Sequence, residues 1–133
     1  MNAQLRPAMS IDDFEAGNID PDRFDHEAHV YMGWLFIREF GAAAAIVRFD
    51  AALKRLLALL GAEGKYHATM TWFFLLLIAE RHRDGDDWLQ FKQQNSDLVA
   101  NSKCTLSRYY SKEFLFSTTA RERFVLPDRL AAG

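Results

Sequence analysis

Two short histidine motifs hold the side chains of this chain that are best suited to chemistry. The first is Phe-Asp-His-Glu-Ala-His at residues 24–29, and the second is Tyr-His-Ala-Thr-Met-Thr at residues 66–71. Three of the four histidines lie in these motifs, and each motif opens an apolar segment with helical spacing. Neutral imidazole is the commonest nitrogen ligand for zinc, iron and copper. The motifs therefore make a metal or small-ligand site the leading functional hypothesis.

The spacing of the histidines predicts that they converge. His26 and His29 are three residues apart, which places both imidazoles on one side of a helix. His67 supplies a third nitrogen if the helix that follows it begins beside the first helix. In an up-down-up bundle the first and third helices are parallel, so their N-terminal ends lie together. The predicted metal ligands are thus His26, His29 and His67, with zinc or iron as the metal.

The second motif also contains three side chains with hydroxyl groups. Tyr66, Thr69 and Thr71 are the predicted ligand-binding residues, because they can hydrogen-bond a ligand or orient an imidazole. The Glu-x-x-His repeats of di-iron bundles and the His-Glu-x-x-His motif of zinc proteases do not occur in the chain. The partial positive charge at a helix start favours neutral imidazole or a neighbouring anion.

The alternative is that these histidines are structural. His26 and His29 are then ordinary residues of a first helical turn, and His67 is a buried histidine bonded to a backbone carbonyl or a threonine. On this interpretation the chain is a non-catalytic interaction protein or dimeric scaffold, whose partner or second copy binds exposed aromatic side chains, such as Trp88 or Tyr109 and Tyr110, or the acidic N-terminal arm. The sequence does not distinguish enzyme from binding protein. For an enzyme, metal-assisted or acid–base chemistry on a small molecule is the natural class.

The elements that position these residues are all expected to be helices. Apolar spacing predicts long helices over residues 26–40, 42–60 and 65–83, followed by several short C-terminal helices. Residues 1–23 are expected to form an irregular acidic N-terminal arm, and residues 24–133 a single helical domain. The predicted fold is therefore an all-α, single-domain bundle of three longer helices plus short C-terminal ones.

Composition limits the partners. The 133 residues are 50% hydrophobic and carry a net charge of −2, which gives no general reason to bind nucleic acid or an anionic membrane. Residues 1–27 carry a net charge of −5, so this segment either faces water or docks on the basic C-terminal third. The longest apolar run, residues 72–79, is far shorter than the roughly 20 residues of a membrane span. With Cys104 as a lone thiol and no signal pattern, a cytoplasmic location is expected.

The two histidine motifs, together with Phe-Val-Leu-Pro-Asp at residues 124–128, resemble a group of small uncharacterised bacterial all-helical proteins. The resemblance covers most of residues 24–128. No activity is established for that group, so the resemblance transfers no catalytic residue. It implies that six motif residues belong to one shared site: His26, His29, Tyr66, His67, Thr69 and Thr71.

Overall fold

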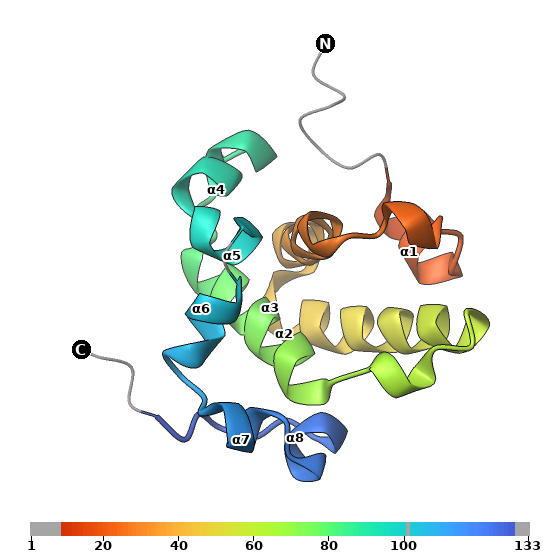
Figure 1. Ribbon diagram of the computed structural model, residues 1–133. Helices are drawn as coiled ribbons and strands as arrows, with labels where there is room; N and C mark the ends of the chain where they lie inside the picture. The colour runs from red at the N-terminus through yellow and green to blue at the C-terminus, as the bar shows by residue number, and fades with distance from the viewer. Residues whose placement is uncertain (1–8, 101, 130–133) are drawn as a thin grey trace.

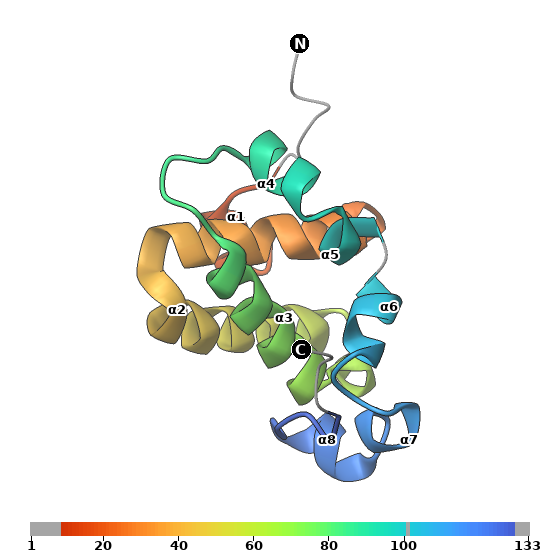
Figure 2. The same cartoon turned by 90° about the vertical axis from the view of Figure 1, so that its left-hand side faces the viewer.

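The computed structural model describes residues 9–100 and 102–129, and it is helical with no strand in these ranges. This confirms the predicted all-α fold of longer helices followed by short C-terminal ones (Figures 1 and 2). The helices are α1 (Ile11–Ala16), α2 (His26–Leu59), α3 (Ala68–Arg81), α4 (Trp88–Gln94), α5 (Ser96–Ala100), α6 (Ser102–Ser107), α7 (Lys112–Leu115) and α8 (Thr118–Glu122), with 3-10 turns η2 (Pro21–Arg23) and η3 (Glu63–Lys65).

Gly41 divides α2 into two halves that run in different directions. Its backbone has φ +76° and ψ 166°, a conformation open essentially to glycine alone. Figure 1 shows the first half nearly end-on and the second half lying across the picture. The predicted bounds of these two segments, 26–40 and 42–60, are confirmed to within one residue.

Helix α2 resembles a membrane-spanning helix in its length and its apolar composition. It is long and apolar enough by length and composition, with a mean hydropathy of 1.4 in its most apolar window. More than half of that window is buried inside the fold, as in the core helix of a globular protein. The helix therefore gives only weak evidence for a membrane.

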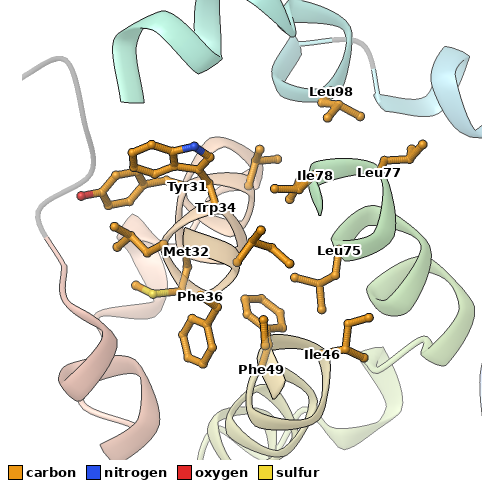
Figure 3. Packing of buried hydrophobic residues seen from close by; sticks show 14 of the residues in the cluster. Tyr31, Met32, Trp34, Phe36, Ile46, Phe49, Leu75, Leu77, Ile78 and Leu98 are labelled. Atoms are coloured by element: carbon orange, nitrogen blue, oxygen red, sulfur yellow. The ribbon is translucent and has the colours of Figure 1, made fainter. Parts of the chain in front are cut away.

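The first half of α2 packs closely on α3 because Gly33 has no side chain. A Cβ atom at this position would lie 3.0 Å from Ile78 Cδ1 and 3.1 Å from Leu75 Cδ2, tighter than ordinary van der Waals contact. Figure 3 shows side chains from both halves of α2 and from α3 meeting in one core. There Phe36 and Phe49 pack edge to face, with ring centroids 5.4 Å apart.

The N-terminal segment is more ordered than the sequence predicted. Residues 1–8 lie outside the described residues, but residues 11–16 form α1, which Ser10 caps. Phe14 is fully buried, and the carboxylate of Glu15 pairs with Arg48 of α2 at 2.7 Å. The prediction of an irregular arm was wrong for α1, because one buried phenylalanine and one ion pair fix a short helix within an acidic stretch.

Side chains cap the starts of α3, α4, α7 and α8. His67 is the N-cap of α3, so this helix begins at Ala68 instead of the predicted position 65. Ser111 and Ser117 cap α7 and α8 through their hydroxyl groups. Figure 2 shows the short helices from α4 to α8 wrapping around α2 and α3 from one end to the other.

Candidate functional site

A cavity of about 320 Å³ lies between the two halves of α2, the turn η3 and the start of α3. Most of its wall is apolar, and its polar side chains come mainly from the N-terminal ends of α2 and α3. The apolar lining consists of Val30, Gly33, Phe49, Leu53, Leu57, Met70, Phe74, Leu75 and Ile78. The polar lining consists of His26, His29, Lys65, Tyr66, His67 and Thr71.

The cavity collects five of the six residues that the sequence assigned to one site. His26 and His29 come from the N-terminal end of α2, whereas Tyr66, His67 and Thr71 come from the segment that leads into α3. The two helix starts lie together, although the turn at Gly41 makes the arrangement less regular than an up-down-up bundle. These five residues share one wall but have different hydrogen-bonding states.

Thr69 does not line the cavity. Its side chain is fully buried, and its hydroxyl donates to the Arg123 carbonyl at 3.0 Å and accepts from the Val125 N–H at 3.1 Å. These bonds hold the segment after α8 against the start of α3. The geometry therefore assigns Thr69 a structural contact in place of the predicted contact with a ligand.

Both ring nitrogens of His67 are occupied. Its Nε2–H donates to the Leu115 carbonyl at 2.8 Å, and its Nδ1 accepts the Met70 N–H at 3.2 Å, which caps α3. Because Nδ1 accepts a backbone N–H, the ring is neutral with its proton on Nε2. Burial lowers the pKa of His67, and the bond to Leu115 partly opposes this shift. His67 therefore has no free lone pair for a metal.

One nitrogen of His26 is also occupied. Its Nε2–H donates to the Leu98 carbonyl at 2.8 Å, which ties the start of α2 to α5. Its ring meets the edge of Phe74, with centroids 5.6 Å apart. The side chain is exposed at the mouth of the cavity, and within the described residues Nδ1 has no hydrogen-bond partner. His26 therefore offers the cavity one acceptor.

His29 differs from both. Its ring stacks on Phe24 with centroids 3.9 Å apart, and within residues 9–100 and 102–129 neither nitrogen has a hydrogen-bond partner. Phe24 precedes the Asp25 N-cap, so this contact is the hydrophobic staple of α2. Burial and then the charge of His26 lower the pKa of His29 to about 4, against the opposing effect of Asp25. At neutral pH His29 is thus an uncharged imidazole with an unused donor and an unused acceptor.

Asp50 is a polar residue of this region that the sequence interpretation missed. Its Oδ1 accepts from the Tyr66 hydroxyl and from Trp72 Nε1 at 3.2 Å, and its Oδ2 pairs with Lys54 at 3.0 Å. Burial and then the bond to Asp50 raise the pKa of Tyr66 well above its usual value. In the sequence Asp50 appears only as one more residue on the polar face of α2, since its partners are 16 and 22 positions away. The network holds the Tyr66 ring in the cavity wall and leaves its hydroxyl occupied.

The three imidazoles do not form a metal-ligand set. No group of three or more His, Cys, Asp or Glu side chains in the described part of the chain is placed to hold a metal ion. The physical reasons are that His67 uses both nitrogens and that, among residues 9–100 and 102–129, no carboxylate lines the cavity. The predicted zinc or iron site at His26, His29 and His67 therefore receives no support from the geometry.

Comparisons with family models, curated proteins and solved structures found no match for this chain. The predicted resemblance to small bacterial helical proteins stays a prediction.

Proposed function

We propose that this protein binds a small, mostly apolar molecule in the cavity between α2 and α3, with the polar end of that molecule at His26 and His29. The observation that carries the proposal is the cavity, which combines a volume of about 320 Å³ with an apolar wall and a few grouped polar side chains. Small-molecule sites have this composition, and their volumes begin at roughly 300 Å³.

The wall has a buried floor and an accessible mouth. Val30, Leu53 and Leu75 are at most 5% exposed, whereas the side chains of His26 and Lys65 are exposed to solvent. Protein interiors keep few voids larger than a water molecule, because unfilled space loses dispersion contacts and costs stability. An apolar ligand that enters through the mouth restores these contacts, and this supports a binding role.

The polar groups favour binding over catalysis. The Tyr66 hydroxyl is held by Asp50, and the Thr71 hydroxyl donates to the His67 carbonyl at 2.8 Å. A general acid or base works best with a pKa near the working pH, and the pKa of His29 is about 4. The free imidazole nitrogens can instead orient a bound molecule through hydrogen bonds.

Calorimetric titration with 1-octanol, a neutral amphiphile of suitable size, tests the proposal. Leu57 lines the cavity and is half-buried, so Leu57→Trp fills the space near the mouth. We expect this variant to bind 1-octanol at least about tenfold more weakly than the wild type, a loss of about 1.4 kcal/mol. Val47→Trp is the matched control, because Val47 also lies on α2 but is 66% exposed and outside the cavity lining.

Saturable binding that Leu57→Trp weakens and Val47→Trp preserves supports the function. No binding to the wild type, or equal binding to all three proteins, contradicts it. The competing hypothesis, that the chain is a scaffold or dimeric interaction protein, predicts one of these two contradicting results.

The cytoplasm is the compartment that we propose for this binding role. Cys104 is an exposed free thiol, and a free thiol persists in a reducing compartment. A thiol-reactive label applied to intact and to lysed cells tests this location, with labelling expected only after lysis.

A further inference from the structure

We propose that the ligand is a small amphiphilic anion, with an apolar body in the cavity and a carboxylate at the mouth between Lys65, His26 and His29. This inference rests on the proposed binding function and specifies the class of ligand. It follows from the charge of the lining, from the unused hydrogen-bonding groups and from the volume of the cavity.

The lining is unbalanced in charge. Lys65 and three imidazoles contribute to it, and no Asp or Glu side chain of the described part of the chain does. Among the described residues the Lys65 ammonium has no ion-pair partner, whereas Lys54 and Lys92 pair with Asp50 and Glu27. A cation without a partner at the mouth of an apolar cavity favours an anion over a neutral group.

The acidic residues beside His26 and His29 in the sequence already have partners, and Asp50, which accepts from the Tyr66 hydroxyl of the lining, pairs with Lys54 at 3.0 Å. The carboxylate of Asp25 accepts the Ala28 N–H at 2.9 Å as the N-cap of α2, and Glu27 pairs with Lys92 at 2.9 Å. Both negative charges are therefore already compensated by donors of the protein. The N-terminal end of α2, where His26 and His29 lie, adds partial positive charge to the same region.

His29 provides the second, independent observation. It is the imidazole in the cavity wall with both nitrogens free of hydrogen bonds among the described residues. The N–H of the neutral His29 ring can donate to a carboxylate, and this hydrogen bond is charge-assisted because the acceptor is ionised. The charged groups around it are Asp25 and His26 on α2, Lys65 on η3 and His67 at the start of α3. A bound anion adds to the effect of Asp25 and raises the pKa of His29.

The volume sets the size of the ligand. A cavity of about 320 Å³ holds roughly ten water-sized groups, since each occupies about 30 Å³ of liquid volume. Octanoate, with about ten non-hydrogen atoms, therefore matches the cavity. 1-Octanol has the same chain with a neutral hydroxyl, so the two compounds isolate the effect of the charge.

Calorimetric titration of octanoate and 1-octanol into the same protein at pH 7 tests the inference. We expect octanoate to bind at least about fivefold more tightly than 1-octanol. Lys65→Met should weaken octanoate binding at least about threefold and leave 1-octanol binding unchanged, and His29→Phe should weaken octanoate binding at least about threefold more than 1-octanol binding, because the hydrogen bond to a carboxylate is the stronger one. Lys112→Met is the matched control, because this exposed lysine of α7 lies outside the cavity lining.

The outcomes separate the two proposals. If 1-octanol binds as tightly as octanoate, or if Lys65→Met and His29→Phe leave octanoate binding intact, the anionic class is wrong and the binding function stands. If neither compound binds to the wild type, both proposals fail. If octanoate binds more tightly than 1-octanol and both variants remove this difference, the binding function and the anionic class are both supported.

Discussion

The N-terminal ends of α2 and α3 both present imidazoles to one cavity, but they use them differently. At the start of α3, His67 binds two backbone groups and fixes the helix in place. At the start of α2, Asp25 supplies the N-cap, which leaves His29 with a stacking contact and no hydrogen bond within the described residues. The comparison teaches that the residue which caps a helix decides whether a nearby histidine is structural or free to meet a ligand.

Removal of the His67 ring should have the largest effect on stability. His67→Ala removes the N-cap of α3, which contributes about 0.5–2 kcal/mol, and leaves the buried Leu115 carbonyl without its donor, which costs about 1–3 kcal/mol. We expect the free energy of unfolding to fall by about 2–4 kcal/mol in urea denaturation. His67→Asn is the control, because asparagine is a good N-cap and should recover part of the loss. A loss below about 1 kcal/mol in His67→Ala would contradict the structural assignment.

Acid should reveal the different state of His29. The unfolded imidazole binds a proton below pH about 6.5, whereas the folded one does so only below pH about 4. Between these values the unfolded state binds more protons, so stability falls as the pH falls, by up to about 3 kcal/mol from His29. The lowered pKa of His67 adds to the same slope. Urea denaturation at several pH values from 7.5 to 4 measures the loss.

His29→Phe sharpens this prediction. The variant keeps a ring on Phe24 and removes the titrating group, so its stability at pH 7.5 should stay within about 1 kcal/mol of the wild type. Its acid-induced loss should be markedly smaller. The pKa values of the carboxylates of Glu15, Asp97 and Asp128 are lowered, so their contributions to stability are lost mainly below about pH 4.5, and the slope between pH 7.5 and 5 reports the histidines. An unchanged slope in His29→Phe would show that His29 does not titrate as described.

His26 should have the smallest effect on stability. Its ring is exposed and donates one hydrogen bond to the Leu98 carbonyl, and a typical bond of this kind contributes about 0.5–1.5 kcal/mol. We expect His26→Ala to lower the free energy of unfolding by about 1 kcal/mol, measured in urea. His26→Gln keeps a side-chain donor and is the matched control. A loss as large as that of His67→Ala would remove the distinction between the two helix starts.

The predictable part of this fold and site comes from short-range signals. Gly41 marks the division of α2 because its backbone conformation excludes other residues, and Asp25 marks the start of α2 as a local N-cap. The meeting of His26, His29 and His67 follows from the order of the helices, so the sequence could predict a shared cavity wall.

The unpredictable part depends on long-range partners. The Leu115 carbonyl that accepts from His67 is 48 residues away, and Tyr66 and Trp72, which donate to Asp50, are 16 and 22 residues away. The local sequence does not show that both ring nitrogens of His67 are hydrogen-bonded, or that Asp50 accepts hydrogen bonds from Tyr66 and Trp72. The burial of Phe14 in α1 depends on distant segments in the same way, since its ring packs on Phe36 and Phe49 of α2.

A nuclear magnetic resonance experiment on the ring nitrogens of ¹⁵N-labelled protein tests the central claim most directly. Long-range ¹H–¹⁵N spectra recorded between pH 7.5 and 4.5, with and without octanoate, report the tautomer and protonation of each histidine. We predict that octanoate shifts the His29 nitrogens and raises the pKa of His29, while His67 keeps its proton on Nε2 throughout. A ligand response at His67 with none at His29, or no response at either residue, would contradict the account.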